Sequence, residues 1–237
     1  MTLDLERFRQ NYLRLEHAVG ERARRCGFAA PRIVIVTKYL ALDDTHRLVK
    51  AGFGPLGESR AQDLVAKCPV AGVPRANTSH PRWHFIGHLQ RNKLGAVLSR
   101  VELVHSLDSR RLVDAIHAAL VRTPTGDYCR RFLVQVNTSG EATKGGLSPE
   151  AAATEVPRWI EEFPELRIEG LMTIAPVADA AVCRACFRRL RETRDRIQDV
   201  LAAPNKLSDL SMGMSGDFEV AVEEGATWIR LGSILYD

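Results

Sequence analysis

The run Ile33-Val34-Ile35-Val36-Thr37-Lys38 is apolar and rich in β-branched residues, and it ends in a lysine. A short continuous run of this kind is typical of a strand buried on both faces, as in a parallel sheet covered by helices. Near the other end of the chain, Thr227-Trp228-Ile229-Arg230-Leu231 has a similar pattern and is followed by Gly232 and Ser233. We therefore expect parallel strands in both places, and they would be neighbours if the sheet closes on itself.

Six segments between these two runs also have strand character, and helical patterns separate them. The expected strands are 53–57, 83–87, 101–105, 132–136, 166–174 and 207–212. An amphipathic helix precedes the first strand, and Ser148-Pro149-Glu150 is a typical helix start, with a capping serine before a proline. Residues 58–67 and 89–99 are expected to be helical, whereas 69–81 and 122–130 are the segments that could form lids.

Alternation of strand and helix indicates the α/β class and a parallel sheet. Eight such units in 237 residues favour a closed (β/α)8 barrel, a TIM barrel, over an open sheet. We expect residues 1–237 to form a single domain of this kind, with one extra N-terminal helix.

Composition and charge are those of an ordinary globular protein, with 45% hydrophobic residues, 26% charged residues and a net charge of +4. The arginines of 184–196 alternate with acids, as on a solvated helix face, so we expect no nucleic-acid partner. The sequence contains neither a signal peptide nor an apolar run of the roughly 20 residues that a membrane span requires. Five cysteines make no disulfide framework here, and we expect a cytoplasmic monomer.

Cys183 and Cys186 have the CxxC spacing of half a zinc site. There is no second pair of this spacing to complete four ligands, and the segment falls in an expected helix, where positions three apart share a face. We therefore expect no bound metal.

The chemistry of a (β/α)8 barrel lies at the carboxyl ends of its strands, and phosphate usually binds beside strands seven and eight. Here the seventh expected strand leads into Gly213-Met214-Ser215-Gly216, and the eighth leads into Gly232-Ser233. Glycines let backbone N–H groups approach an anion, and serines donate hydroxyl groups to it. Lys38 ends the first strand at the same rim, where partial burial would favour the neutral amine that attacks an aldehyde.

Arg230 is a charge inside an apolar strand, and such a charge needs a partner. One candidate partner is an acid at the barrel rim such as Glu58, and the other is the pyridine nitrogen of a cofactor. An arginine stays charged, so it would leave that nitrogen unprotonated and make the ring a weak electron sink. The amine, the fixed cation and the phosphate-sized turns together point to pyridoxal phosphate (PLP).

Seven segments, in the same order along the chain, resemble those of the pyridoxal phosphate homeostasis proteins, single-domain relatives of the alanine racemase amino-terminal barrel. The segments are Val36-Thr37-Lys38, Leu56-Gly57-Glu58-Ser59-Arg60, Trp83-His84-Phe85-Ile86-Gly87-His88-Leu89-Gln90-Arg91-Asn92-Lys93, Val136-Asn137-Thr138-Ser139-Gly140-Glu141, Glu169-Gly170-Leu171-Met172-Thr173-Ile174, Leu210-Ser211-Met212-Gly213-Met214-Ser215 and Ile229-Arg230-Leu231-Gly232-Ser233. One position departs from the resemblance: the family usually has asparagine where this chain has Ser59, and a serine replaces only one of the amide's hydrogen bonds.

The resemblance implies a set of cofactor-binding residues: Lys38, Ser59, Met172, Ser211, Ser215, Arg230, Gly232 and Ser233. Lys38 would hold PLP as a Schiff base, and Arg230 would lie near the ring nitrogen. Ser215, Gly232 and Ser233 would bind the phosphate, and the remaining residues would line the pocket.

Racemases of this barrel type continue into a second domain, which supplies a tyrosine base to the opposite face of the substrate. This chain ends a few residues after the last expected strand, and Tyr39 shares its strand end with Lys38. We therefore expect a protein that buffers PLP or delivers it to apo-enzymes, with no catalytic residue of its own. The alternatives are a weak amino-acid racemase or decarboxylase, and a regulatory scaffold that binds no cofactor.

Overall fold

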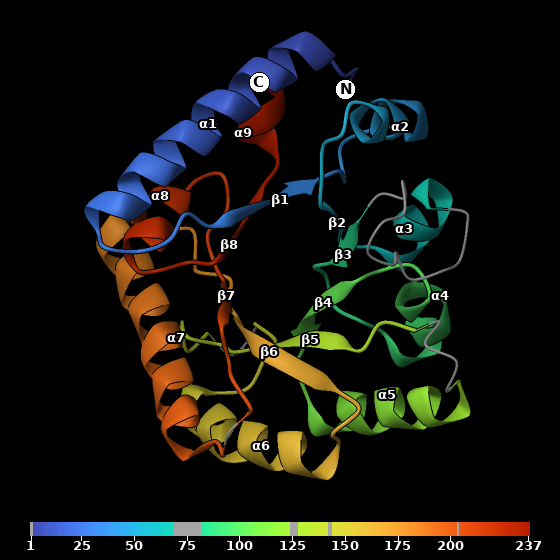
Figure 1. Ribbon diagram of the computed structural model, residues 1–237, viewed down its shortest axis with the longest axis vertical. Helices are drawn as coiled ribbons and strands as arrows, with labels where there is room; N and C mark the ends of the chain where they lie inside the picture. The colour runs from blue at the N-terminus through green and yellow to red at the C-terminus, as the bar shows by residue number, and fades with distance from the viewer. Residues whose placement is uncertain (1, 69–81, 124–127, 142–143, 203) are drawn as a thin grey trace.

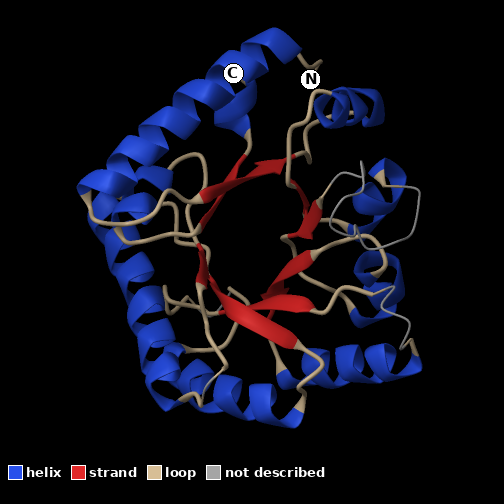
Figure 2. Ribbon diagram, in the orientation of Figure 1, coloured by secondary structure: helices blue, strands red, loops and turns tan. Residues whose placement is uncertain are grey.

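Eight parallel strands form a closed barrel in a computed structural model of the protein, which describes residues 2–68, 82–123, 128–141, 144–202 and 204–237 (Figures 1 and 2). The strands are β1 (Arg32–Val36), β2 (Leu56–Glu58), β3 (Trp83–Phe85), β4 (Leu103–Leu107), β5 (Arg131–Gln135), β6 (Arg167–Met172), β7 (Asp209–Ser211) and β8 (Trp228–Leu231). The expected (β/α)8 barrel is therefore confirmed.

The helices surround the barrel (Figure 2). They are α1 (Leu5–Arg25), α2 (Leu42–Lys50), α3 (Ala61–Lys67), α4 (Leu94–Leu98), α5 (Arg110–Arg122), α6 (Pro149–Glu162), α7 (Ala180–Val200), α8 (Phe218–Glu223) and α9 (Ser233–Tyr236), with a 3-10 turn, η1 (Arg91–Lys93), before α4. The extra N-terminal helix α1 begins at a cap, since the side chain of Asp4 accepts hydrogen bonds from the backbone N–H groups of Glu6 and Arg7. No helix in these described ranges is long and apolar enough to cross a membrane.

The barrel closes where β1 pairs with β8, as the sequence predicts for its first and last strands. Arg32 lies opposite Trp228, and Val34 lies opposite Arg230. Helix α1 contacts α8 and α9 beside this seam (Figure 1). The side chain of Asn11 donates to the backbone oxygen of Asp237, 2.9 Å away. The closure places the ends of β1 and β8 side by side, with Arg230 in β8 opposite Val34 and Lys38 two residues beyond the end of β1.

Side chains along β1 alternate between two apolar layers, because successive residues of a strand face opposite sides. Ile33 and Ile35 belong to the large cluster between the barrel and its helices. Val34 belongs to a small cluster inside the barrel, together with Met172 and Trp228. The inner face of the strands therefore carries the residues whose side chains can meet across the barrel.

The strands are generally shorter than predicted. The first ends at Val36, because the chain turns at the next residues and the backbone N–H of Leu40 donates to the oxygen of Thr37. The strand expected at 53–57 is Leu56–Glu58, and the one expected at 166–174 is Arg167–Met172.

The two helices predicted from the first half of the chain are shorter as well. The helix expected over 58–67 begins at Ala61, because Glu58 is still in the sheet, opposite Phe85. The one expected over 89–99 is reduced to η1 and α4. The proposed lid segment 69–81 lies outside the described residues, as do 124–127 in the centre of the other one.

The arginine run of α7 is partly exposed, as the sequence predicts, with Arg188, Arg189 and Arg196 on the surface, but three of its members also bind one buried acid. Arg184, Arg188 and Arg191 all form ion pairs with Glu224, whose side chain is only 4% exposed. Arg184 also pairs with Glu223, which binds Arg22 of α1. The run therefore joins three helices on one side of the barrel.

Candidate functional site

Lys38 follows β1 at the carboxyl rim of the barrel. Its side chain is exposed, with Nζ 4.8 Å from the centre of the Tyr39 ring. The partial burial expected of this amine is therefore wrong, because β1 ends before it and the chain turns outward at this point. An exposed amine at the rim is accessible to a dissolved aldehyde.

The residue before Lys38 is fixed by a buried ion pair. Lys67 of α3 donates from Nζ to the backbone oxygen of Thr37 at 2.7 Å and to Oε1 of Glu58 at 2.6 Å. The hydroxyl of Thr37 donates to the same carboxylate oxygen at 2.7 Å. These contacts hold the Thr37 backbone in place, so the exposed Lys38 side chain extends from a fixed position.

Arg230 lies inside the barrel and is 4% exposed. Its NH1 donates to the hydroxyl of Ser211 at 2.6 Å, and its NH2 donates to the backbone oxygen of Thr173 at 2.9 Å. Burial lowers the pKa of the guanidinium to about 10, so it remains charged at neutral pH. Glu58, one of the two partners considered from the sequence, is instead paired with Lys67.

The loops that follow β7 and β8 are joined by a hydrogen bond. The backbone N–H of Gly232 donates to the hydroxyl of Ser215 at 3.2 Å. Gly213 has a φ of 95°, and a Cβ at this residue would lie 2.6 Å from that of Ala221, so the turn after β7 requires glycine. Ser233 is exposed at the start of α9. Ser215, Gly232 and Ser233 therefore lie in connected loops at one part of the rim.

The structure brings most of the predicted site residues together, but not all of them. Met172 pairs with Ser211 between β6 and β7, and both are buried. Ser59 follows β2 and lines a separate cavity of about 340 Å³ together with Arg60, His88 and Lys93. Position 59 therefore lies at the same rim without a recorded contact to the other predicted residues.

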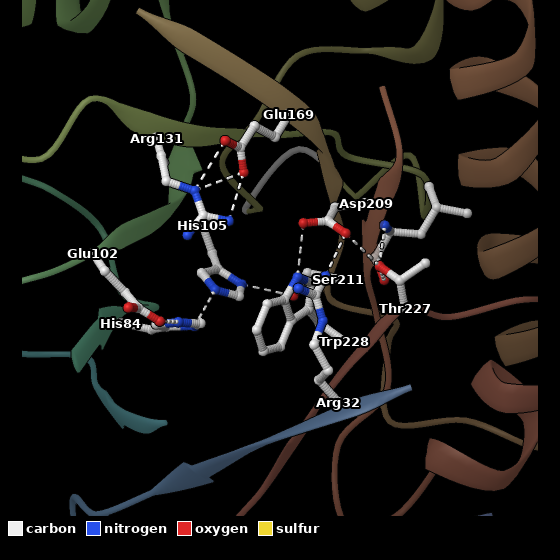
Figure 3. A network of polar contacts seen from close by, with 11 residues as sticks. Arg32, His84, Glu102, His105, Arg131, Glu169, Asp209, Ser211, Thr227 and Trp228 are labelled. Atoms are coloured by element: carbon white, nitrogen blue, oxygen red, sulfur yellow. Dashed lines mark hydrogen bonds and ion pairs between the residues drawn. The ribbon is translucent and has the colours of Figure 1, made fainter. Parts of the chain in front are cut away.

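A line of polar side chains continues from Ser211, the partner of Arg230, into the barrel (Figure 3). Beyond Ser211 it contains His105, His84 and Glu102. The two histidines occupy strand positions that are otherwise apolar, which was a signal for an internal polar cluster. Their mutual contact depends on the alignment of β3 and β4 and could not be derived from spacing.

The amino end of the barrel is closed by a different set of contacts. Asp209 accepts a hydrogen bond from Nε1 of Trp228 at 2.9 Å and binds Arg32 at 2.6 Å. The Arg32 guanidinium also lies 3.6 Å from the centre of the Trp228 ring. These contacts connect the starts of β1, β7 and β8 at the amino end.

Comparison with known proteins identifies the family. The family described as "Alanine racemase, N-terminal domain" matches residues 3–237. A pyridoxal phosphate homeostasis protein of Aquifex aeolicus is 37% identical over 217 residues, which cover 91% of this chain and 90% of that protein. The chain belongs to the pyridoxal phosphate homeostasis protein family. The resemblance inferred from the sequence motifs is thereby confirmed.

Solved structures agree with this membership. A protein of unknown function from Bifidobacterium adolescentis is 31% identical, with a TM-score of 0.84, and the match covers 99% of this chain and 98% of that one. PipY of Synechococcus elongatus, solved with PLP bound, is 28% identical with a TM-score of 0.74, and the match covers 92% of this chain and 100% of PipY. An alanine racemase of Clostridium difficile, at 15% identity and a TM-score of 0.70, shares the fold.

Proposed function

We propose that this chain binds PLP as a Schiff base on Lys38, and that it buffers the cofactor or delivers it to other proteins. The observation that carries this proposal is the meeting of three features at one rim: an exposed amine after β1, a buried cation on the neighbouring β8, and joined serine–glycine loops after β7 and β8. The PLP-bound structure of PipY supports it.

The residues at the rim fit the aldehyde and the phosphate of PLP. When bound, PLP supplies an aldehyde, which condenses with a primary amine to a C=N bond with loss of water. The phosphate would lie at Ser215, Gly232 and Ser233, where hydroxyl and backbone N–H groups are close together. We propose the following residues as the binding site: Lys38, Ser59, Met172, Ser211, Ser215, Arg230, Gly232 and Ser233.

Arg230 favours holding the cofactor over carbanion chemistry. It is charged at neutral pH and fixed by Ser211 and Thr173. A fixed cation at the ring nitrogen would keep that nitrogen unprotonated, so the ring would withdraw few electrons. Reversible condensation at an exposed amine needs no such withdrawal, and it allows exchange of the cofactor with solvent.

We therefore propose a carrier rather than an enzyme, acting as a cytoplasmic monomer with PLP-dependent apo-enzymes as recipients. The support is that several relatives are named homeostasis proteins, and that Tyr39 contacts Lys38 from the same strand end. Two-base racemisation needs a second base on the face of the substrate opposite Lys38. Incubation with single amino-acid enantiomers tests the alternative: racemisation or carbon dioxide release at ordinary enzyme rates would contradict the carrier proposal.

Borohydride reduction tests the binding residue. The purified chain is mixed with PLP, reduced and digested, and its peptides are examined by mass spectrometry. We expect the reduced adduct on the peptide that contains Lys38, and a Lys206→Arg control should give the same map, because Lys206 is exposed in the segment before β7, at the other end of the barrel. An adduct mapped to another lysine in the unmodified chain would contradict the assignment of Lys38, and no adduct at all would overturn the proposed function.

A further inference from the structure

Four hydrogen bonds connect the carboxyl rim to the amino end through the inside of the barrel. Arg230 donates to the Ser211 hydroxyl at 2.6 Å, and that hydroxyl lies 2.8 Å from Nδ1 of His105. Nε2 of His105 lies 3.0 Å from Nδ1 of His84, whose Nε2 lies 3.0 Å from Oε1 of Glu102. Figure 3 shows the part from Glu102 to Ser211 as one continuous path.

The surroundings hold this path in place. Both imidazoles are completely buried. The ring of Trp228 packs edge-on against them, with centroids 4.8 Å from His84 and 6.2 Å from His105. Side chains of this kind cannot rotate to find other partners, so the positions of the donors and acceptors are fixed by packing.

The protons on the path can be ordered in only one way. Burial lowers the pKa of both histidines, so each carries a single ring proton at neutral pH. Burial alone would raise the pKa of Glu102, but the His84 hydrogen bond and the charges of Arg82 and Arg131 bring it below its usual value, so the carboxylate is ionised and accepts only.

The order follows from the carboxylate end. Glu102 accepts from Nε2 of His84, so Nδ1 of His84 has no proton and accepts from Nε2 of His105. Nδ1 of His105 then accepts from the Ser211 hydroxyl. Because the Ser211 hydroxyl donates its proton to His105, its oxygen accepts the hydrogen bond from NH1 of Arg230. In every hydrogen bond on the path, the donor is on the Arg230 side and the acceptor is on the Glu102 side.

We propose that His105, His84 and Glu102 are positioning residues for Arg230, which they hold through the Ser211 hydroxyl. This proposal rests on the proposed function, since Arg230 matters to the ligand only if PLP binds at the rim. Its consequence is that a carboxylate at the amino end of the barrel sets the orientation of the cation at the carboxyl end. Removing that charge should disturb the bound cofactor without touching any residue of its site.

Two glutamates at the amino end of the barrel provide a matched comparison. The side chain of Glu102 is 14% exposed and ends the path, whereas that of Glu169 is 18% exposed and pairs with Arg131. Glu102→Gln and Glu169→Gln remove the same charge from the same end of the barrel. Only the first change removes the charged acceptor at the end of the path and so weakens its last hydrogen bond.

The first test measures PLP in the full-length chain. Folding is checked by circular dichroism, and the visible absorbance maximum and the rate of PLP release are then recorded. We expect Glu102→Gln and His105→Phe to shift the maximum and to release PLP about three- to tenfold faster, the effect of one weakened hydrogen bond. Glu169→Gln should stay within about twofold of the unmodified chain. If Glu102→Gln matches Glu169→Gln in both measurements, the positioning role is wrong.

The second test needs no cofactor and no variant. Nitrogen-15 NMR of the unmodified chain reports which ring nitrogen of each histidine carries the proton. We expect both His84 and His105 to be neutral with the proton on Nε2, and a proton on Nδ1 of either one would overturn the proposal. Failure of the chain to bind PLP would overturn the proposed function, while this measurement would still decide the proton order.

Discussion

The position of the Lys38 backbone depends on two buried residues of neighbouring elements. Lys67 and Glu58 form an ion pair that is almost completely buried and that holds the backbone of Thr37. Among the residues that the structure describes, none forms a hydrogen bond with Oε2 of Glu58. A buried pair of this kind adds little net stability, but it is costly to break, because removing one member leaves an uncompensated charge.

Lys67→Met should therefore destabilise the protein by about 3–5 kcal/mol, because it leaves the Glu58 carboxylate buried without its cation. Urea denaturation of the purified variant measures the free energy of unfolding. The double variant Lys67→Met/Glu58→Gln should recover part of the loss, since no charge remains buried. A double variant that is no more stable than Lys67→Met would contradict this account.

Arg230→Lys tests the geometry of the buried cation rather than its charge. A lysine keeps the charge, but it cannot present the planar fork that reaches both the Ser211 hydroxyl and the Thr173 oxygen. We expect the affinity for PLP, measured by fluorescence titration, to fall by about tenfold or more, since a hydrogen bond from a charged group is lost. Arg32→Lys, at the amino end of the same strand pair, is the control and should leave the affinity nearly unchanged.

At the scale of the elements, the loops after β7 and β8 act together because the strands that precede them are adjacent in the sheet. The helices are joined in a comparable way on the outside. Glu224, at the end of α8, forms ion pairs with three arginines of α7. Glu223 of the same helix forms an ion pair with Arg22 of α1. The arginines of α7 thus stabilise the contact between helices.

Glu224→Gln should lower the free energy of unfolding by about 1.5–3 kcal/mol, because three partly exposed arginines would lose hydrogen bonds to a charged acceptor that is shielded from solvent. Glu219→Gln is the matched control on the same helix: its side chain is 57% exposed and pairs with Arg22. A surface pair of that kind contributes less than about 1 kcal/mol. Thermal or urea unfolding of both variants measures the difference, and equal losses would contradict the role of burial.

At the scale of the whole molecule, the two histidines inside the barrel connect its stability to pH. Burial lowers the pKa of His84 and His105 below the ordinary histidine value of about 6.5, so the unfolded chain takes up protons that the folded chain does not. The free energy of unfolding should therefore be highest above about pH 6.5 and fall as the pH decreases below it. The slope is at most about 1.4 kcal/mol per pH unit for each histidine.

Urea denaturation at several values between pH 5 and pH 8 checks this linkage. His46→Gln, a change at an exposed residue of α2, is the control variant. A stability that stays constant over this whole range would mean that folding does not change the pKa of the two histidines, and it would contradict the effect of their burial.

The sequence alone was enough to predict the barrel and its chemical rim, because both follow from local patterns. The β-branched run before Lys38, its counterpart around Arg230 and the small-residue turns after the last two strands each depend on neighbours a few residues away. Their meeting at one rim then follows from the rule that parallel strands of a barrel end on the same side.

The tertiary structure decided what depends on register and burial. His105 meets His84 across 21 positions and Ser211 across 106, and no local pattern specifies such contacts. The exposure of Lys38 likewise depends on where β1 stops. The periodicity of the sequence indicates which face of a strand a residue occupies. Only the alignment of the eight strands decides which residue lies opposite it. Hydrogen bonds form only where that alignment brings a donor within about 3 Å of an acceptor.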